Sequence, residues 1–343
     1  MGVSMRIRDY GVVIGEMPTG RLNKITDVPG VTVGHSTIAS GKHNTGVTVI
    51  MTSDKNPFHH KLPAASVVLN GFGKSQGLVQ VDELGQLETP IALTNTLNVG
   101  LVWDAVVEYI LRRCATDGLF VPSSINPVVC ECNDARLSDI RHRAVGQKDV
   151  FDAIAAATVD FEEGAVGAGR GTVCHGLKGG IGTASRVMEY DGKKYTLGVL
   201  VQSNYGRLSD LRIDGRPVGK EIASGALEED KGSIIVVMGT DLPLSDRQIK
   251  RVLRRTGVGL ARVGSFTGHG SGEVFVGFST VNAMEGDDKA IRTTESFRED
   301  LMNGPFRAMA EATEEAVLDS MSCSVAVGDV KSLVDYLPRL LKR

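Results

Sequence analysis

The sequence predicts a layered α+β fold in which β-sheets are stacked between helices. Strand-like and helix-like segments occur in groups along the chain and do not alternate one by one, which favours layered sheets over βαβ units. Glycine occurs 41 times in 343 residues, and its usual share is only about 7%. The glycines separate short β-branched runs, as in a sheet-rich protein with many tight turns. No linker and no repeat of fixed period divides the sequence, so we expect a single domain over residues 1–343.

The first half of the chain begins with strands and continues with helices. Short β-branched runs predict strands at residues 31–35, 46–50 and 66–70, the last of which enters a glycine loop at 71–77. A helix is expected over residues 98–115, where apolar residues recur on one face at helical spacing. These residues are Val99, Val102, Val106, Ile110 and Leu111. An alanine-rich segment predicts a second helix over 149–162.

The second half returns to strands around a polar segment. A glycine-dense stretch, 164–182, precedes a strand expected at 195–202, and residues 209–232 are polar and end in a charged, flexible-looking run, 228–232. The apolar run 234–238 then predicts a buried central strand. Ser245 and Gln248 form the capping box of an amphipathic helix. A strand near 274–279 and helices over 294–321 and 330–342 complete the chain.

Composition and charge exclude several classes of partner. The formal net charge is −3, whereas binding a nucleic acid or an anionic membrane requires a basic face. No apolar run reaches the roughly 18 residues of a membrane span, and the N-terminal stretch lacks the apolar core of a signal peptide. We therefore expect a cytoplasmic protein. The five cysteines are unevenly spaced, which is typical of reduced intracellular proteins and matches no zinc pattern, so neither a metal nor a cofactor is expected.

The junction between the charged run and the apolar strand contains the first candidate for chemistry, the dipeptide Gly232-Ser233. The strand would hold Ser233 in place, while Gly232 can adopt strained backbone geometry and leave its carbonyl open to attack. These conditions suit an N→O acyl shift, after which the ester hydrolyses. The freed α-amine, with an ordinary pKa of about 8, could then help to deprotonate the hydroxyl beside it. On local sequence alone, Gly-Ser is more often an ordinary turn at the start of a strand.

Two further segments carry polar groups at strand ends. Ser271 and Glu273 lie two residues apart in a glycine-rich turn, so an extended backbone places both on one side, where the carboxylate could orient a proton. Asn204 ends the strand expected at 195–202, where an amide can donate to a developing oxyanion. Taken alone, each segment also fits ordinary turn chemistry, which is the more frequent explanation for Ser271 and Glu273.

Two motif matches point to a different site. Residues 73–75 resemble the end of a phosphate-binding P-loop, but Val68 stands where that motif needs glycine. Residues 73–77 also match G-x-S-x-G, the nucleophile elbow of α/β hydrolases, with Ser75 at its centre. The β-branched segment that follows, 78–82, predicts a poor start for the required helix. A G-x-S-x-G esterase using Ser75 stays open as an alternative.

Taken together, several segments resemble the P1 family of self-processing aminopeptidases, which includes the L-aminopeptidase/D-amidase/esterase DmpA and the β-peptidyl aminopeptidases. The matching segments run in the same order and comprise residues 23–35, 85–91, 94–96, 129–134, 201–206, 232–241 and 268–273. Chance does not produce so many ordered matches, so the turn interpretation of Gly232-Ser233 is rejected. The resemblance implies a four-layer αββα sandwich of the DmpA/ornithine acetyltransferase type, in a topology distinct from that of the Ntn hydrolases.

The resemblance also implies self-processing and assigns the residues that carry it. Cleavage between Gly232 and Ser233 would give a large chain, 1–232, and a small chain, 233–343, which stay associated and form a homo-oligomer of processed heterodimers. Ser233 would be the nucleophile of an acyl-enzyme mechanism. Ser271 and Glu273 would support it, and Asn204 would stabilise the oxyanion.

Two residues are implied in substrate binding. Glu131 stands where the family can bind the free amino group of the substrate, as an exopeptidase needs. Asn133 stands where some members have a tyrosine near the oxyanion, and that departure leaves its role open. The expected substrates are small peptides, amides or esters with a free amino group.

Two other functions remain alternatives beside the Ser75 esterase. An acyltransferase of the ornithine acetyltransferase-like fold would transfer an acyl group to an amine faster than to water, but those enzymes use threonine as the nucleophile and position 233 is serine. A non-catalytic binding protein would remain an intact chain and would not acylate.

Overall fold

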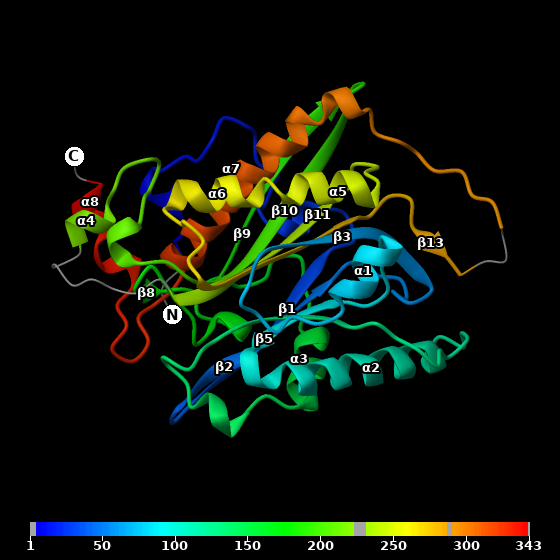
Figure 1. Cartoon of the computed structure of the whole chain (residues 1–343), viewed down its shortest axis with the longest axis horizontal. Helices are drawn as coiled ribbons and strands as arrows, with labels where there is room; N and C mark the ends of the chain where they lie inside the picture. The colour runs from blue at the N-terminus through cyan, green and yellow to red at the C-terminus, as the bar shows by residue number, and fades with distance from the viewer. Residues whose placement is uncertain (1–4, 223–230, 287–289, 342–343) are drawn as a thin grey trace.

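The computed structural model describes residues 5–222, 231–286 and 290–341. Two β-sheets lie face to face between two layers of helices (Figure 1). The layers follow in the order helix, sheet, sheet, helix, which confirms the predicted αββα sandwich. Most of the charged run expected at 228–232 lies outside the described residues.

The larger sheet contains the strand that begins at the Gly232-Ser233 junction. Its strands follow in the order β13 (Met284–Glu285), β3 (His60–Gly71), β12 (Gly270–Ser279), β11 (Lys231–Thr240), β10 (Lys193–Asn204) and β9 (Ile181–Tyr190), with β4 (Gln86–Leu87) paired to β3. Neighbouring strands are antiparallel except β11 and β12, which run parallel. Residues 234–238 of β11 are buried, as expected for a central strand covered on both faces.

The smaller sheet packs its inner face against the larger one. Its strands follow in the order β1 (Thr32–Ser40), β2 (His43–Met51), β5 (Ile91–Asn95) and β6 (Val128–Cys132). One buried apolar cluster joins the two sheets and includes Ile50, Leu93 and Cys130 from the smaller sheet and Leu200, Ile235 and Val276 from the larger. This core holds β6 against β10 and β11.

Helices cover the outer face of each sheet. The larger sheet is covered by α5 (Asp246–Leu253), α6 (Thr256–Val263) and α7 (Asn303–Ser322), and the smaller sheet by α2 (Val99–Thr116) and α3 (Gln147–Ala155) (Figure 1). The predicted capping box is confirmed, since Ser245 accepts from the Gln248 N–H at the start of α5. The connections contain α1 (Leu78–Leu84), α4 (Gly219–Ile222), α8 (Leu337–Leu340) and the hairpin of β7 (Val173–Cys174) and β8 (Leu177–Lys178).

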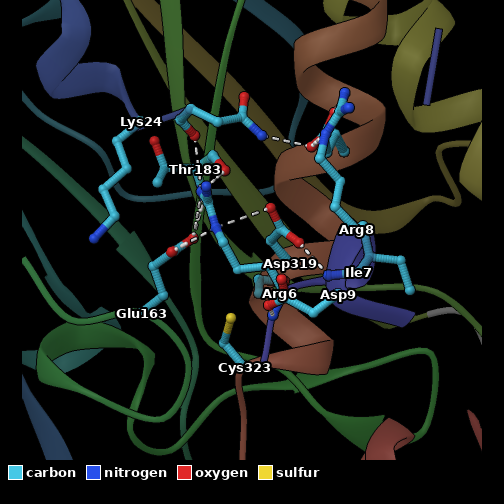
Figure 2. Close-up of polar contacts among 12 residues, drawn as sticks. Arg6, Ile7, Arg8, Asp9, Lys24, Glu163, Thr183, Asp319 and Cys323 are labelled. Atoms are coloured by element: carbon cyan, nitrogen blue, oxygen red, sulfur yellow. Dashed lines mark hydrogen bonds and ion pairs between the residues drawn. The ribbon is translucent and has the colours of Figure 1, made fainter. Parts of the chain in front are cut away.

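The start of the chain is fastened to α7 by buried charges. Arg6 lies between two carboxylates, with its Nε 2.9 Å from Glu163 Oε2 and 3.4 Å from Asp319 Oδ2 (Figure 2). Asp319 also accepts from the Ile7 N–H at 2.7 Å. Burial raises the pKa of Asp319 well above its ordinary value, although the Arg6 guanidinium opposes that rise. The N-terminal segment therefore supplies the cation that lies beside the buried Asp319 carboxylate of α7.

Three helices differ from the sequence prediction in their bounds. α3 ends at Ala155 and does not reach 162, because Thr158 exchanges two backbone hydrogen bonds of 3.0 Å with Val33 of β1. α7 begins at Asn303 and not near 294, with Pro305 in its first turn, where a missing N–H is tolerated. Within 330–342, the described α-helix is confined to α8, which has Pro338 at its start.

Two predictions about element type also differ from the structure. The segment predicted to be a poor helix start forms α1, bounded by Gly77 and Gly85 at φ values of 87° and 64°. Val81 of α1 is buried in the core between the sheets, so packing overrides the low helix propensity of β-branched residues. Strand β9 was not predicted, because it begins in the glycine-dense stretch. Gly182 of β9 allows α7 to approach, since a Cβ there would lie 2.0 Å from the Ala316 carbonyl oxygen.

Candidate active site

A pocket of about 650 Å³ lies where the ends of strands from both sheets meet. β6 contributes Glu131, β10 ends in it with Asn204, and β11 begins in it with Gly232 and Ser233. The remaining lining residues are Phe72, Lys74, Thr96, Asn133, Arg136, Val173, Gly176, Gly206, Gly270 and Val330. The pocket therefore brings together residues that the sequence analysis placed on widely separated segments.

Ser233 and Asn204 stand side by side on one wall of the pocket. The strand register pairs Asn204 with Ser233 and Ser233 with Gly272, and directly opposed residues project to the same face of a sheet. A Cβ at position 272 would lie 3.2 Å from Ser233 Oγ, so Gly272 leaves room beside the hydroxyl. Ser233 is 6% exposed and Asn204 7%. A nearly buried hydroxyl thus has an amide as its neighbour across the strands.

A backbone donor fixes the orientation of the Asn204 amide. The Val173 N–H donates to Asn204 Oδ1 at 2.9 Å, and because a backbone N–H can only donate, the oxygen must be the atom that faces it. Within the described residues, Asn204 Nδ2 has no acceptor. The amide therefore offers N–H donors to a group bound in the pocket, as an oxyanion donor must.

Gly232 has a backbone conformation that suits glycine alone. Its φ is 150°, and a Cβ there would lie 1.9 Å from the Asn204 carbonyl oxygen. Glycine is therefore needed for both the backbone angle and the close approach of β10. Both residues of the Gly232–Ser233 bond line the pocket.

Ser271 and Glu273 form a buried pair beside this bond. The Ser271 hydroxyl donates to the Glu273 carboxylate, and the two residues are 1% and 0% exposed. The register places Ser271 opposite Gly232. Because side chains alternate along a strand, the pair lies on the opposite face of the sheet from the Ser233 side chain. It therefore adjoins the bond from the side of Gly232.

Glu131 is a buried carboxylate that is held by neutral donors. It is 2% exposed, and its Oε1 accepts from the Lys74 N–H at 2.9 Å while its Oε2 accepts from the Thr96 hydroxyl. Within the described part of the chain, no cation pairs with it. A buried carboxylate without a counter-charge favours binding of a cation from outside. Asn133 stands exposed at the rim, where its Oδ1 accepts from the Ala135 N–H at 3.0 Å.

Several groups at the site were not assigned from the sequence. Thr96 and the Lys74 N–H orient Glu131, and the Val173 N–H orients Asn204. The Cys132 thiol donates to the Ser233 carbonyl at 3.5 Å, and burial raises the pKa of Cys132 well above its ordinary value, which keeps it a thiol. Thr96 lies in one of the matching segments, so the sequence could have indicated it as a site residue. The contact of Val173 is made by its backbone N–H, so the type of residue at this position does not indicate it.

Ser75 lies outside the wall of the pocket. Its hydroxyl is buried against Cys130, whereas the nucleophile of an elbow must be exposed above the sheet. The helix that the elbow requires is present as α1, so that objection was wrong. The burial of the hydroxyl is the argument that disfavours Ser75.

A serine hydroxyl, an oriented amide and a carboxylate without a cation, arranged around one pocket, suit attack on an amide next to an ammonium group. The fold and this site define a serine-type aminopeptidase, which is a hydrolase. The chain belongs to peptidase family S58, whose profile matches residues 23–333. It is 39% identical over 348 residues to the beta-peptidyl aminopeptidase BapA of Sphingosinicella xenopeptidilytica, covering 93% of this chain and 85% of that protein.

Two solved structures are similar over nearly the whole chain. A Burkholderia sp. beta-aminopeptidase is 39% identical with a TM-score of 0.90, and 99% of each chain is covered. The l-aminopeptidase d-ala-esterase/amidase of Ochrobactrum anthropi is 33% identical with a TM-score of 0.92, and the match covers 98% of this chain and 97% of that one. The latter is described as a new variant among the Ntn hydrolase fold, so the expected distinction from Ntn hydrolases is one within that fold.

These similarities confirm the predicted family, that of the DmpA-like and β-peptidyl aminopeptidases, and the predicted class of enzyme, a serine aminopeptidase. Membership of a peptidase family argues against both the binding-protein and the acyltransferase alternatives. Among the described residues, no helix is long and apolar enough to cross a bilayer. The same residues contain no group of three or more His, Cys, Asp or Glu side chains placed to hold a metal ion.

Proposed function

We propose that this aminopeptidase matures by cleaving its own Gly232–Ser233 bond. The Ser233 hydroxyl attacks the Gly232 carbonyl carbon, the C–N bond breaks, and the chain is held for a time by an ester. Water then hydrolyses the ester, which leaves a carboxylate on Gly232 and a free α-amine on Ser233. The positive φ of Gly232 and the close approach of the Asn204 carbonyl, which a residue with a Cβ could not adopt, support a glycine-specific placement of this peptide bond in the pocket.

The same hydroxyl then serves as the catalytic nucleophile. Ser233 Oγ attacks the carbonyl of the substrate, its proton passes to the α-amine of Ser233, and the tetrahedral oxyanion receives hydrogen bonds from Asn204 Nδ2. The C–N or C–O bond breaks, and the leaving group takes up the proton. Water hydrolyses the acyl-enzyme and restores the hydroxyl. The oriented, nearly buried Asn204 amide supports this role because preorganised donors are worth most away from water.

The Ser271–Glu273 pair is proposed to stabilise the α-amine of Ser233 while this amine carries the proton between these steps. Ser271 lies opposite Gly232, so after cleavage it stands beside the position that the amine occupies. The hydrogen bond from Ser271 to the buried Glu273 carboxylate would stabilise the positive charge of a protonated amine.

Glu131 is proposed to bind the free amino group of the substrate. Its carboxylate lines the same pocket as Ser233 and has no cation among the described residues, so an ammonium group would complete an ion pair away from bulk water. The substrates are therefore short peptides, amides or esters with a free N-terminal amine. The relatives include a beta-peptidyl aminopeptidase and an l-aminopeptidase. This supports testing both β- and α-amino compounds as substrates. Asn133, at the rim, is proposed to contact the substrate beyond the scissile bond.

The processed pair of chains is proposed to assemble further. Exposed apolar side chains occur near the end of β3, at Val68 and Leu69, and Leu69 lies next to Gly257 of α6. An exposed apolar group of this kind suits an interface between subunits. Light scattering on the eluting protein measures the mass of the assembly, and a monomeric pair of chains would contradict this proposal.

The meeting of Ser233, Asn204 and Glu131 in one pocket is the observation that carries the proposed function. The enzyme is mixed with a 4-nitrophenyl ester of an amino acid, and the reaction is quenched in acid during turnover. The acyl group of the ester should then be found on the peptide that contains Ser233. The Ser75→Ala variant is the matched control and should be labelled to the same extent. Label on Ser75 in place of Ser233 would exclude this mechanism.

A further inference from the structure

A buried lysine that the mechanism above does not use lies behind the pocket. Lys178 of β8 is 0% exposed and is among the largest fully buried side chains. Its Nζ donates to three backbone carbonyls, at 2.9 Å to Gly169, 2.8 Å to Thr172 and 2.6 Å to Gly179. Three acceptors at these distances match the three protons of an ammonium group. The geometry therefore favours the charged form.

The position of this charge is unusual for a structural lysine. Lysine is almost never fully buried unless it is paired, and in the part of the chain that the structure describes, no carboxylate pairs with Lys178. Burial lowers the pKa of Lys178 well below its ordinary value and the charge on Arg170 lowers it further, whereas the three carbonyl acceptors oppose that fall by binding the ammonium. An uncompensated cation at this depth suits a site where negative charge develops nearby.

A single peptide unit connects Lys178 with Asn204. The Thr172 carbonyl accepts from Lys178 Nζ, and the N–H of the same peptide unit, that of Val173, donates to Asn204 Oδ1 at 2.9 Å. An ammonium bound to a carbonyl polarises the peptide and makes its N–H a stronger donor. That N–H in turn polarises the amide, so each hydrogen bond strengthens the next. The chain of hydrogen bonds ends at the amide of Asn204, which lines the pocket.

The same side chain also fixes the segment that carries this peptide unit. Its three acceptors belong to the two ends and the middle of the stretch 169–179, which includes the β7–β8 hairpin. The hairpin is joined to the end of β10 by the His175 N–H, which donates to the Tyr205 carbonyl at 2.7 Å. Loss of the ammonium would therefore loosen the placement of the Val173 N–H against Asn204, which the Gly179 N–H also supports by donating to the Thr172 carbonyl at 3.2 Å.

We propose that Lys178 is a positioning residue that orients and polarises the Asn204 amide through the Thr172–Val173 peptide, so that Asn204 stabilises the oxyanion. This inference rests on the proposed role of Asn204. It makes Lys178 important for the chemical step and unimportant for binding the substrate, which Glu131 governs.

A double-mutant cycle tests the inference with an amino-acid 4-nitroanilide as the substrate. Rates are normalised to the processed fraction, measured by intact mass. Asn204→Ala is expected to lower kcat about 100-fold or more, as loss of one oxyanion donor does. Lys178→Met is expected to lower kcat at least about 10-fold with KM changed less than about 3-fold, because the donor remains but is weaker and misplaced. The double variant should have the kcat of Asn204→Ala alone.

Lys24→Met is the matched control for removing a buried ammonium. Lys24 Nζ contacts the Phe161 carbonyl and Asp160 away from the pocket, so this variant should lose stability and keep its kcat. If Lys178→Met does not fold, Lys178→Gln takes its place in the cycle, since it keeps two N–H donors without the charge.

The two possible failures have different signatures. If Lys178→Met or Lys178→Gln lowers kcat by the same factor with and without Asn204, or leaves kcat unchanged, the inference about Lys178 is wrong. If Asn204→Ala itself leaves kcat unchanged, the proposed role of Asn204 is wrong, whatever the Lys178 variants do.

Discussion

Replacing Glu131 with glutamine should separate recognition of the substrate amine from the chemistry at Ser233. Glutamine keeps the size of the side chain and retains an oxygen for the Lys74 N–H, which donates to Glu131 at 2.9 Å. What is lost is the negative charge that faces the pocket, and the Thr96 hydroxyl must then accept from the amide group where it donated to Oε2. The variant therefore tests the charge without opening a cavity.

The size of the effect follows from the burial of the carboxylate. An ion pair at about 4 Å with an effective dielectric constant of about 20 is worth about 4 kcal/mol. The pocket admits water, so we take about 3 kcal/mol, which corresponds to about a 100-fold loss in kcat/KM. Glu131 itself is 2% exposed, which argues against a smaller value.

The assay compares an amino-acid amide with its N-acetylated form. Glu131→Gln should lower kcat/KM about 100-fold for the free amine and leave the slow reaction of the neutral N-acetyl compound nearly unchanged. Glu108→Gln, at a half-buried carboxylate of α2 that pairs with Arg112, is the control for removal of a carboxylate. A Glu131→Gln enzyme within about 3-fold of the wild type on the free amine, less than 1 kcal/mol, would refute the assigned role.

Three further predictions concern maturation and stability. Gly232→Ala should slow self-cleavage at least about 10-fold by intact mass, because a Cβ 1.9 Å from the Asn204 carbonyl oxygen displaces the scissile bond. Burial lowers the pKa of His35 to about 4, so the unfolded state binds this proton first as the pH falls from about 6.5. The unfolding free energy in urea should then drop by about 2.5 kcal/mol between pH 6.5 and 4, and His35→Gln should flatten that slope. Arg6→Met should lower the unfolding free energy by about 3–5 kcal/mol by leaving two buried carboxylates without a cation, whereas the exposed Lys148→Met should not change it measurably.

Local patterns in the sequence predict much of the fold. The apolar run 234–238, the capping box at Ser245 and the one-sided apolar residues of α2 each report a local structure, and each is confirmed except Leu111, which lies outside the buried face of α2. The errors lie where distant parts of the chain decide the outcome. α3 stops because Thr158 pairs with β1, and α1 forms because Val81 is needed in the core. No pattern within either segment contains that information.

The site shows the same division between local and distant information. The collinear matching segments led to Ser233, Asn204, Glu131 and Asn133, and all four line one pocket. What the sequence could not provide is the relation between strands far apart in the chain. The placement of Ser271 beside Gly232, on the opposite face from the Ser233 side chain, follows from the parallel register of β11 and β12. The contact of Lys178 with the Thr172 carbonyl follows from the hairpin and involves no recognisable motif.

The central claim is that Ser233 becomes an N-terminus by breaking its own peptide bond. An intact-mass spectrum under denaturing conditions, taken on freshly purified wild type and on Ser233→Ala, tests it most directly. We predict two species in the wild type, one ending at Gly232 and one beginning at Ser233, and a single uncut chain in the variant. An uncut wild-type chain that still hydrolyses amino-acid amides would contradict the account.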